Sequence, residues 1–194
     1  MNTNKKFKVV LMGASSAGKT SIVVRFSRGT FGGDQESTIG AAFISRDVET
    51  EKGPVTLHIW DTAGQERYRS LVPRYSQGSK AIVIVFDVTD PESFEGAQQW
   101  FQEAQDMHAN KVKYYLIANK IDLPAKVDLE KVQEYARQTG MCYYATSAKT
   151  GENITNLFDT IAGDVAAMIP ADQDPDEVLL EARKKDEGKS GKCC

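Results

Sequence analysis

Several features that define other classes of protein are scarce in this 194-residue chain. It has three cysteines, Cys142, Cys193 and Cys194, which are too few for a disulfide framework, so we expect the reducing cytosol as its compartment. No apolar run approaches the roughly 20 residues that a membrane-spanning helix needs, and the polar residues 1–8 do not read as a secretion signal. The formal net charge of −3 argues against a nucleic-acid partner, because phosphate-backbone binding requires a basic face.

What the chain does have is the composition of an ordinary globular protein. Apolar residues make up 41% and charged residues 26%, and the length suits one domain with an appendage. After Pro170 the character changes, because residues 172–181 are rich in acidic side chains and residues 183–192 in basic ones. We therefore expect a globular domain over residues 1–169 and a flexible tail over residues 170–194.

Short apolar runs alternate with helical patterns along the first part of the chain. Strands are predicted at residues 5–12, 42–49, 55–60, 81–88, 113–118 and 141–146, and helices after the first strand and at residues 91–108, 128–138 and 153–168. Residues 50–54 read as a hairpin turn between the second and third strands. This pattern predicts an α/β fold with a mostly parallel six-stranded sheet, one antiparallel edge hairpin and helices on both faces.

The first motif lies between the first strand and the first helix. Residues 13–20 (GASSAGKT) fit G-x-x-x-x-G-K-[ST], whose backbone amides form a concave site for phosphates. Lys19 would supply a point charge to the β- and γ-phosphates, and Thr20 a hydroxyl ligand to Mg²⁺. A chance match is expected in roughly one chain in a hundred of this length. The position between strand and helix favours the phosphate-binding loop of a P-loop NTPase.

Two later motifs indicate which base is bound. Residues 119–122 (NKID) follow a predicted strand, at the sheet edge where such folds bind ligands. The Asp122 carboxylate only accepts hydrogen bonds, whereas guanine offers two adjacent donors and adenine neither. Asn119 can tie this loop to its neighbours. Residues 146–149 (TSAK) follow the last strand, where a backbone amide can reach the guanine carbonyl and the Lys149 stem can pack on the base. A solvated turn at 119–122 is the alternative when that motif stands alone.

The remaining motif and one loop residue are placed to read the third phosphate. Residues 61–65 (DTAGQ) end a predicted strand, so Asp61 can hold the Mg²⁺ shell, Gly64 can touch the γ-phosphate and Gln65 can orient an attacking water. Thr38 would complete the Mg²⁺ coordination. Because such contacts exist only while the third phosphate is present, both segments are expected to order with GTP and loosen after hydrolysis. A plain strand-ending turn is the alternative for residues 61–65.

The four motifs, in this order and spacing, resemble those of the Ras superfamily of small GTPases over about residues 5–168. Several segments are similar to the Rab branch, namely residues 39–43 (IGAAF), 57–64 (LHIWDTAG), 67–71 (RYRSL) and the terminal pair Cys193 and Cys194. Residues 35–43 (QESTIGAAF) are most similar to the early-endosomal Rab subgroup.

With the motifs, the resemblance implies a GTP-hydrolysing switch that regulates vesicle and endosome traffic by nucleotide-dependent effector recruitment. The expected catalytic residues are Gln65, Lys19, Thr38 and Gly64, and the expected Mg²⁺ ligands are Thr20, Thr38 and Asp61. The expected nucleotide-binding residues are Ser15, Ser16, Ala17, Gly18, Lys19, Thr20, Ser21, Phe31, Thr38, Gly64, Asn119, Lys120, Asp122, Ser147, Ala148 and Lys149.

The resemblance assigns further roles to aromatic residues and to the tail. It implies that Phe31 packs on the guanine edge and that Phe43, Trp60 and Tyr75 form an exposed triad read by effectors, although ordinary core packing is open for Phe31 and Trp60. It also implies that Cys193 and Cys194 carry two geranylgeranyl groups, with two unmodified thiols as the alternative. One lipid chain binds membranes only marginally, so two anchors agree with the physics.

Some positions depart from the family pattern. Ser15 stands where Ras proteins themselves carry glycine, as is common in Rab proteins, so hydrolysis should survive. Gly32 and Gly33 replace bulkier residues and would loosen the first switch loop. No arginine in the motifs is placed to stabilise the transition state, so hydrolysis should be slow until a partner supplies one, an effect of about 10³–10⁵ in rate.

The resemblance also implies partners and a location. We expect an exchange factor, a GTPase-activating protein, effectors, and prenyl-transfer and membrane-extraction machinery to act on a monomer. That monomer is expected in the cytoplasm, reversibly attached to the cytosolic face of endosomal membranes. Two other functions remain open at this point. They are a GTP-locked scaffold that barely hydrolyses, which Gln65 disfavours, and an ATP-dependent phosphotransferase, which Asp122 disfavours.

Overall fold

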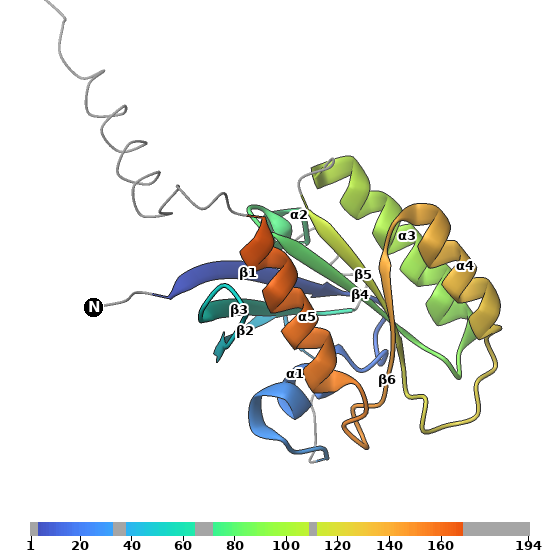
Figure 1. The fold of residues 1–194 in the computed structure, drawn as a ribbon. Coiled ribbons are helices and arrows are strands. Elements are labelled where there is room, and N and C mark those ends of the chain that lie inside the picture. Colours follow the sequence, from blue (N-terminus) through green and yellow to red (C-terminus); the bar gives the residue numbers. More distant parts are fainter. Residues whose placement is uncertain (1–3, 33–37, 65–71, 109–111, 169–194) are drawn as a thin grey trace, which may run out of the picture.

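The computed structural model describes residues 4–32, 38–64, 72–108 and 112–168 (Figure 1). The elements in chain order are β1 (Lys5–Met12), α1 (Lys19–Arg28), β2 (Ala41–Val48), β3 (Val55–Thr62), α2 (Val72–Ser76), β4 (Ala81–Asp87), α3 (Pro91–His108), β5 (Lys113–Asn119), α4 (Leu129–Thr139), β6 (Cys142–Thr146) and α5 (Ile154–Ala167). The six predicted strands are all present, and their ends differ from the prediction by two residues at most.

The strands form one six-stranded sheet in the order β2-β3-β1-β4-β5-β6. Only β2 and β3 pair antiparallel, while β3, β1, β4, β5 and β6 run parallel, which confirms the predicted edge hairpin. The hairpin turn is closed by the Gly53 amide, which donates to the Thr50 carbonyl at 2.9 Å. All the parallel strands therefore end at one edge of the sheet, and their following loops meet there.

Alternation along the strands divides the core into two layers. On β1, Phe7, Val9 and Leu11 pack with α1 and α5, whereas Val10 and Met12 pack with α3 and α4. Figure 1 shows these two helix pairs on opposite faces of the sheet. The central strand β4 is buried along its whole length, as its continuous apolar run predicted.

The short helix α2 was not predicted from the sequence. It has five residues, too few to show a helical period. Tertiary contacts hold it in place, because Tyr75 stacks on Trp60 with ring centroids 6.0 Å apart and the hydroxyl of Ser76 lies 2.8 Å from Nε2 of His108 on α3. Within the described parts of the chain, no helix combines the length and the apolar character needed to cross a bilayer.

Candidate functional site

The phosphate-loop motif occupies the sharp turn between β1 and α1. Gly13 has a φ of 141°, and a Cβ atom there would lie 2.1 Å from the Val85 carbonyl oxygen of β4. Gly18 has a φ of 93°, and a Cβ atom there would lie 2.2 Å from Nδ2 of Asn119. Both positions therefore require glycine, since the loop packs directly against the neighbouring strand and against Asn119.

Lys19 is folded back over this loop. Its side chain is 5% exposed, and Nζ donates to the carbonyl oxygens of Gly13 at 2.9 Å and Ala14 at 2.8 Å. Burial lowers the pKa of Lys19 to about 8, with the nearby Asp61 carboxylate opposing the shift. A Cβ atom at Gly64 would lie 2.5 Å from this Nζ. The predicted catalytic residues Lys19 and Gly64 thus lie side by side.

Three oxygen-bearing side chains meet beside the lysine. The Thr20 hydroxyl donates to Oδ2 of Asp61 at 2.6 Å and lies 2.9 Å from the Thr38 hydroxyl. Oδ1 of Asp61 is buried and has no hydrogen-bond partner among the described residues. Burial raises the pKa of Asp61, while the Thr20 hydroxyl and the Lys19 ammonium oppose this shift.

This donor set fits a hard cation such as Mg²⁺. Hydroxyl and carboxylate oxygens are its preferred ligands, and the unpaired Asp61 oxygen is an acceptor that lacks a partner. The described residues contain no group of three His, Cys, Asp or Glu side chains able to hold a metal unaided. An ion held by Thr20, Thr38 and Asp61 would therefore complete its coordination with phosphate oxygens and water.

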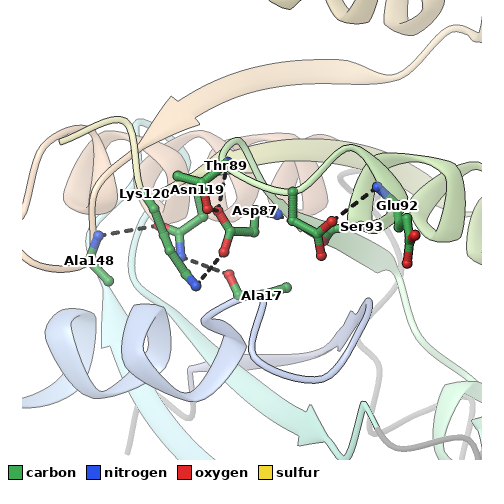
Figure 2. A network of polar contacts seen from close by, with 9 residues as sticks. Ala17, Asp87, Thr89, Glu92, Ser93, Asn119, Lys120 and Ala148 are labelled. Carbon is green, nitrogen blue, oxygen red and sulfur yellow. Dashed lines mark hydrogen bonds and ion pairs between the residues drawn. The ribbon is translucent and has the colours of Figure 1, made fainter. Parts of the chain in front are cut away.

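Asn119, at the end of β5, ties three loops together. Its Nδ2 donates to the Ala17 carbonyl at 2.9 Å, and its Oδ1 accepts from the Thr146 hydroxyl and the Ala148 amide, each at 3.3 Å. Figure 2 shows Asn119 between Ala17 and Ala148. The side chain is 1% exposed, so this linkage is fully buried. The predicted tie between the base loops and the phosphate loop is present in the structure.

Asp122 presents an acceptor at the same end of the sheet. It lies on an exposed turn, but only 13% of its side-chain surface is accessible. Oδ1 accepts from the Ser147 hydroxyl at 2.6 Å, and Oδ2 lies 3.9 Å from Nζ of Lys149. The Ser147 hydroxyl thus fixes the orientation of the Asp122 carboxylate.

The Lys120 side chain is held by a carboxylate that the sequence analysis missed. In Figure 2, Asp87 at the end of β4 lies between Lys120 and Thr89. Oδ2 of Asp87 pairs with Nζ of Lys120, and Oδ1 accepts from the Thr89 amide at 2.8 Å and hydroxyl at 2.7 Å. Burial of the Asp87 carboxylate acts to raise its pKa, but the hydrogen bonds from Lys120 and Thr89 outweigh burial, so the pKa of Asp87 is lowered. The available signal was its position at the end of a buried strand adjacent to β5.

A cavity of about 540 Å³ connects the phosphate loop with Asn119 and Asp122. Its described lining contains every predicted nucleotide-binding residue except Ala17 and Ser147, which support Asn119 and Asp122 from outside. The lining also includes Thr62 and Leu123, which were not predicted to bind the nucleotide. Thr62 lies inside the motif at residues 61–65, and Leu123 directly follows the motif at residues 119–122. Phe31 forms part of the wall and is 47% exposed.

The aromatic triad forms a separate surface cluster. The ring centroids of Phe43 and Trp60 are 5.4 Å apart in an edge-to-face arrangement, and Tyr75 stacks on Trp60. Nζ of Lys8 lies 4.7 Å from the Trp60 ring centroid. Phe43 is 50% exposed, whereas Trp60 is half-buried and packs against the core layer that contains α3 and α4. Gln65, Gly33, Cys193 and Cys194 lie outside the described residues.

Comparison with known proteins agrees with this geometry. The sequence model of the Ras family matches residues 8–167. Ras-related protein Rab5 from Nicotiana tabacum is 42% identical over 195 residues, covering 100% of this chain and 97% of that protein. Ras-related protein Rab-5A from Dictyostelium discoideum is 40% identical over the whole length of both chains. Ras-related protein RABF2b from Arabidopsis thaliana is 43% identical over 100% of this chain and 97% of its own.

Proposed function

We infer the roles of individual residues from the premise that this chain belongs to the Ras family. It is a small GTPase of the early-endosomal Rab type, which binds GTP and GDP with Mg²⁺, hydrolyses GTP and regulates endosomal vesicle traffic. The observation that carries our assignment is one cavity whose described lining contains both Lys19 and Thr20 of the phosphate loop and the Asp122 acceptor. Asp61 stands next to this lining, where it accepts from the Thr20 hydroxyl.

At the phosphate end, the chain supplies positive charge and amide donors. Lys19 and the loop amides bind the β- and γ-phosphates, and the Gly64 amide approaches the γ-phosphate beside Lys19. Thr20, Thr38 and Asp61 would hold Mg²⁺, and the bound ion would supply positive charge against the charge that develops on the phosphates. Gln65 orients the attacking water.

At the base end, the fixed acceptor selects guanine. Asp122 accepts from guanine N1–H and the exocyclic amine, and the 147–149 loop donates to the guanine carbonyl. Phe31 and the stem of Lys149 pack against the base from the cavity wall. Adenine offers no donors to Asp122, so its binding would leave the carboxylate unpaired.

Replacing Gln65 with leucine should slow hydrolysis at least tenfold and leave nucleotide binding intact. Leucine has a similar volume but cannot orient water, whereas none of the proposed binding contacts involves Gln65. Single-turnover hydrolysis of bound GTP measures the rate, and dissociation of labelled GTP measures binding. Gln77→Leu, at an exposed glutamine just after α2, is the matched control. Equal hydrolysis rates in the two variants would remove Gln65 from the mechanism.

The switch output follows from the same contacts. Thr38 and Gly64 sense the γ-phosphate. Thr38 precedes β2, which carries Phe43, and Gly64 follows β3, which carries Trp60. Loss of the γ-phosphate therefore alters the apolar surface that effectors would bind. An exchange factor and an activating protein complete the cycle, and the activating protein would supply the arginine that the motifs lack.

Membrane attachment is proposed to depend on the last two residues, at the end of a tail that begins near residue 170. A variant with Cys193→Ser and Cys194→Ser should move from the endosomal membrane fraction to the soluble fraction, because without lipid the tail has no strong membrane affinity. Localisation of the full-length proteins in cells measures this. Cys142→Ala, at a partly buried thiol on β6, is the control and should stay on membranes. Membrane retention of the double variant would contradict the anchor.

A further inference from the structure

Arg25 on α1 reaches across to the loop that follows β6. Its Nε donates to the Ala148 carbonyl at 2.7 Å, its Nη2 donates to the Lys149 carbonyl, and its Nη1 donates to the Gly29 carbonyl at 2.8 Å. One planar guanidinium thus binds three carbonyl groups from two segments more than 100 positions apart in the chain. A lysine ammonium could not reproduce this fork, because it is a compact point charge.

These contacts fix the direction of the peptide group between Ala148 and Lys149. A trans peptide points its carbonyl and its N–H in opposite directions. Holding the Ala148 carbonyl toward Arg25 therefore turns the N–H of Lys149 away from Arg25. Ala148 and Lys149 line the cavity, whereas Arg25 is not among its described lining residues. Arg25 therefore binds the carbonyl side of this loop and leaves the Lys149 amide on the opposite side of the peptide.

The same guanidinium also contacts the other wall of the base end. Its central carbon lies 6.0 Å from the ring centroid of Phe31, within the range of a cation–π contact. The Gly29 carbonyl that it binds belongs to the C-cap residue that directly follows α1, two positions before Phe31. Arg25 therefore connects the 147–149 loop to the segment that carries Phe31.

We propose that Arg25 is a positioning residue that holds the 147–149 loop and Phe31 against the guanine base and thereby sets how long the nucleotide stays bound. The inference rests on the proposed assignment of the 147–149 loop to the guanine carbonyl. Arg25 touches neither the phosphates nor Mg²⁺ in this scheme. Its loss should accelerate nucleotide release through the base end of the cavity.

The first test measures release of N-methylanthraniloyl-GDP from the full-length chain with Mg²⁺ and excess unlabelled GDP. Arg25→Gln should release the label at least tenfold faster, because charge-assisted hydrogen bonds to two loop carbonyls are lost. Arg25→Lys should fall between Arg25→Gln and the unsubstituted chain. Arg28→Gln, on the last turn of the same helix and exposed, should stay within twofold. An unchanged release rate in Arg25→Gln would overturn the proposal.

The second test separates a positioning role from general support of α1. The affinities of GDP and of 2-aminopurine riboside diphosphate are compared by competition. This analogue lacks the base carbonyl and also the N1–H from which Asp122 would accept, and the second difference is the same in every variant that keeps Asp122. Arg25→Gln should lower the preference for GDP at least threefold, because only GDP uses the loop amides. Equal weakening of both ligands would show a structural role and overturn the proposal. If the unsubstituted chain itself shows no preference, the assignment of the loop to the base fails, and this proposal fails with it.

Discussion

Asp122→Asn is expected to lower the affinity for GDP about 10³-fold and to raise the affinity for xanthosine diphosphate. The Ser147 hydroxyl, 2.6 Å from Oδ1, can still donate to the amide oxygen of asparagine and so keep the side chain in place. The amide NH₂ would then replace Oδ2 at the base, where it meets the two donors of guanine but matches the extra carbonyl of xanthine. The substitution thus replaces a hydrogen-bond acceptor by a donor at the position that contacts the base.

Competition against a fluorescent nucleotide measures both affinities of the Asp122→Asn variant. Asp106→Asn is the control, because Asp106 is an exposed residue of α3 on the far side of the sheet from α1. It carries the same change of charge and should leave both affinities unchanged. Equal GDP affinity in Asp122→Asn and the unsubstituted chain would disprove the assignment of Asp122 to the base.

The sheet was predictable because its signals are local. The continuous apolar run of β4 and the glycine-containing turn between β2 and β3 are read from a few neighbouring residues. The helix α2 gave no such signal, since its five residues depend on Trp60 and His108 from other elements. Contacts with other elements determine that these five residues form a helix, and no local sequence pattern indicates those contacts.

The site was predictable wherever a motif directly follows a strand. Strand order then places the loops after β1, β3, β5 and β6 at one edge of the sheet, where the cavity lies. The residues that position the motif side chains could not be found in this way. Asp87 holds Lys120 from 33 positions away, and Arg25 holds Ala148 from 123 positions away. Neither belongs to a motif, and although Asp87 stands at the end of an apolar strand, the partner of each residue is evident only in the folded chain.

Two of the predicted nucleotide-binding residues, Ala17 and Ser147, lie outside the described lining of the cavity and form hydrogen bonds with Asn119 and Asp122. Their contacts with the nucleotide stay predictions. The motif pattern cannot distinguish a residue that contacts a ligand from one that orients its neighbour. The roles of Gln65 and of the two terminal cysteines stay predictions, since they lie outside the described residues.

Asn119→Ala is expected to accelerate GDP release about 100-fold and to lower the thermal unfolding temperature. Alanine removes the donor to the Ala17 carbonyl and the acceptor for the Thr146 hydroxyl and the Ala148 amide, all within a side chain that is 1% exposed. Buried polar groups left without partners cost about 1–3 kcal/mol each, and three such losses at the low end of this range, about 3 kcal/mol in all, correspond to the expected change in rate. The phosphate loop and the base loops would then move independently, so the nucleotide is no longer held at both ends.

Asn153→Ala separates this effect from a general loss of stability. Asn153 precedes α5, has a φ of 59° that alanine tolerates poorly, and donates from Nδ2 to the Ala145 carbonyl at 2.7 Å. It should therefore lower the unfolding temperature, but it lies outside the described cavity lining and should leave GDP release within twofold of the unsubstituted chain. Stopped-flow release of N-methylanthraniloyl-GDP, together with thermal unfolding, measures both quantities. If the two variants release GDP equally fast, Asn119 stabilises the fold without coupling the two ends of the cavity.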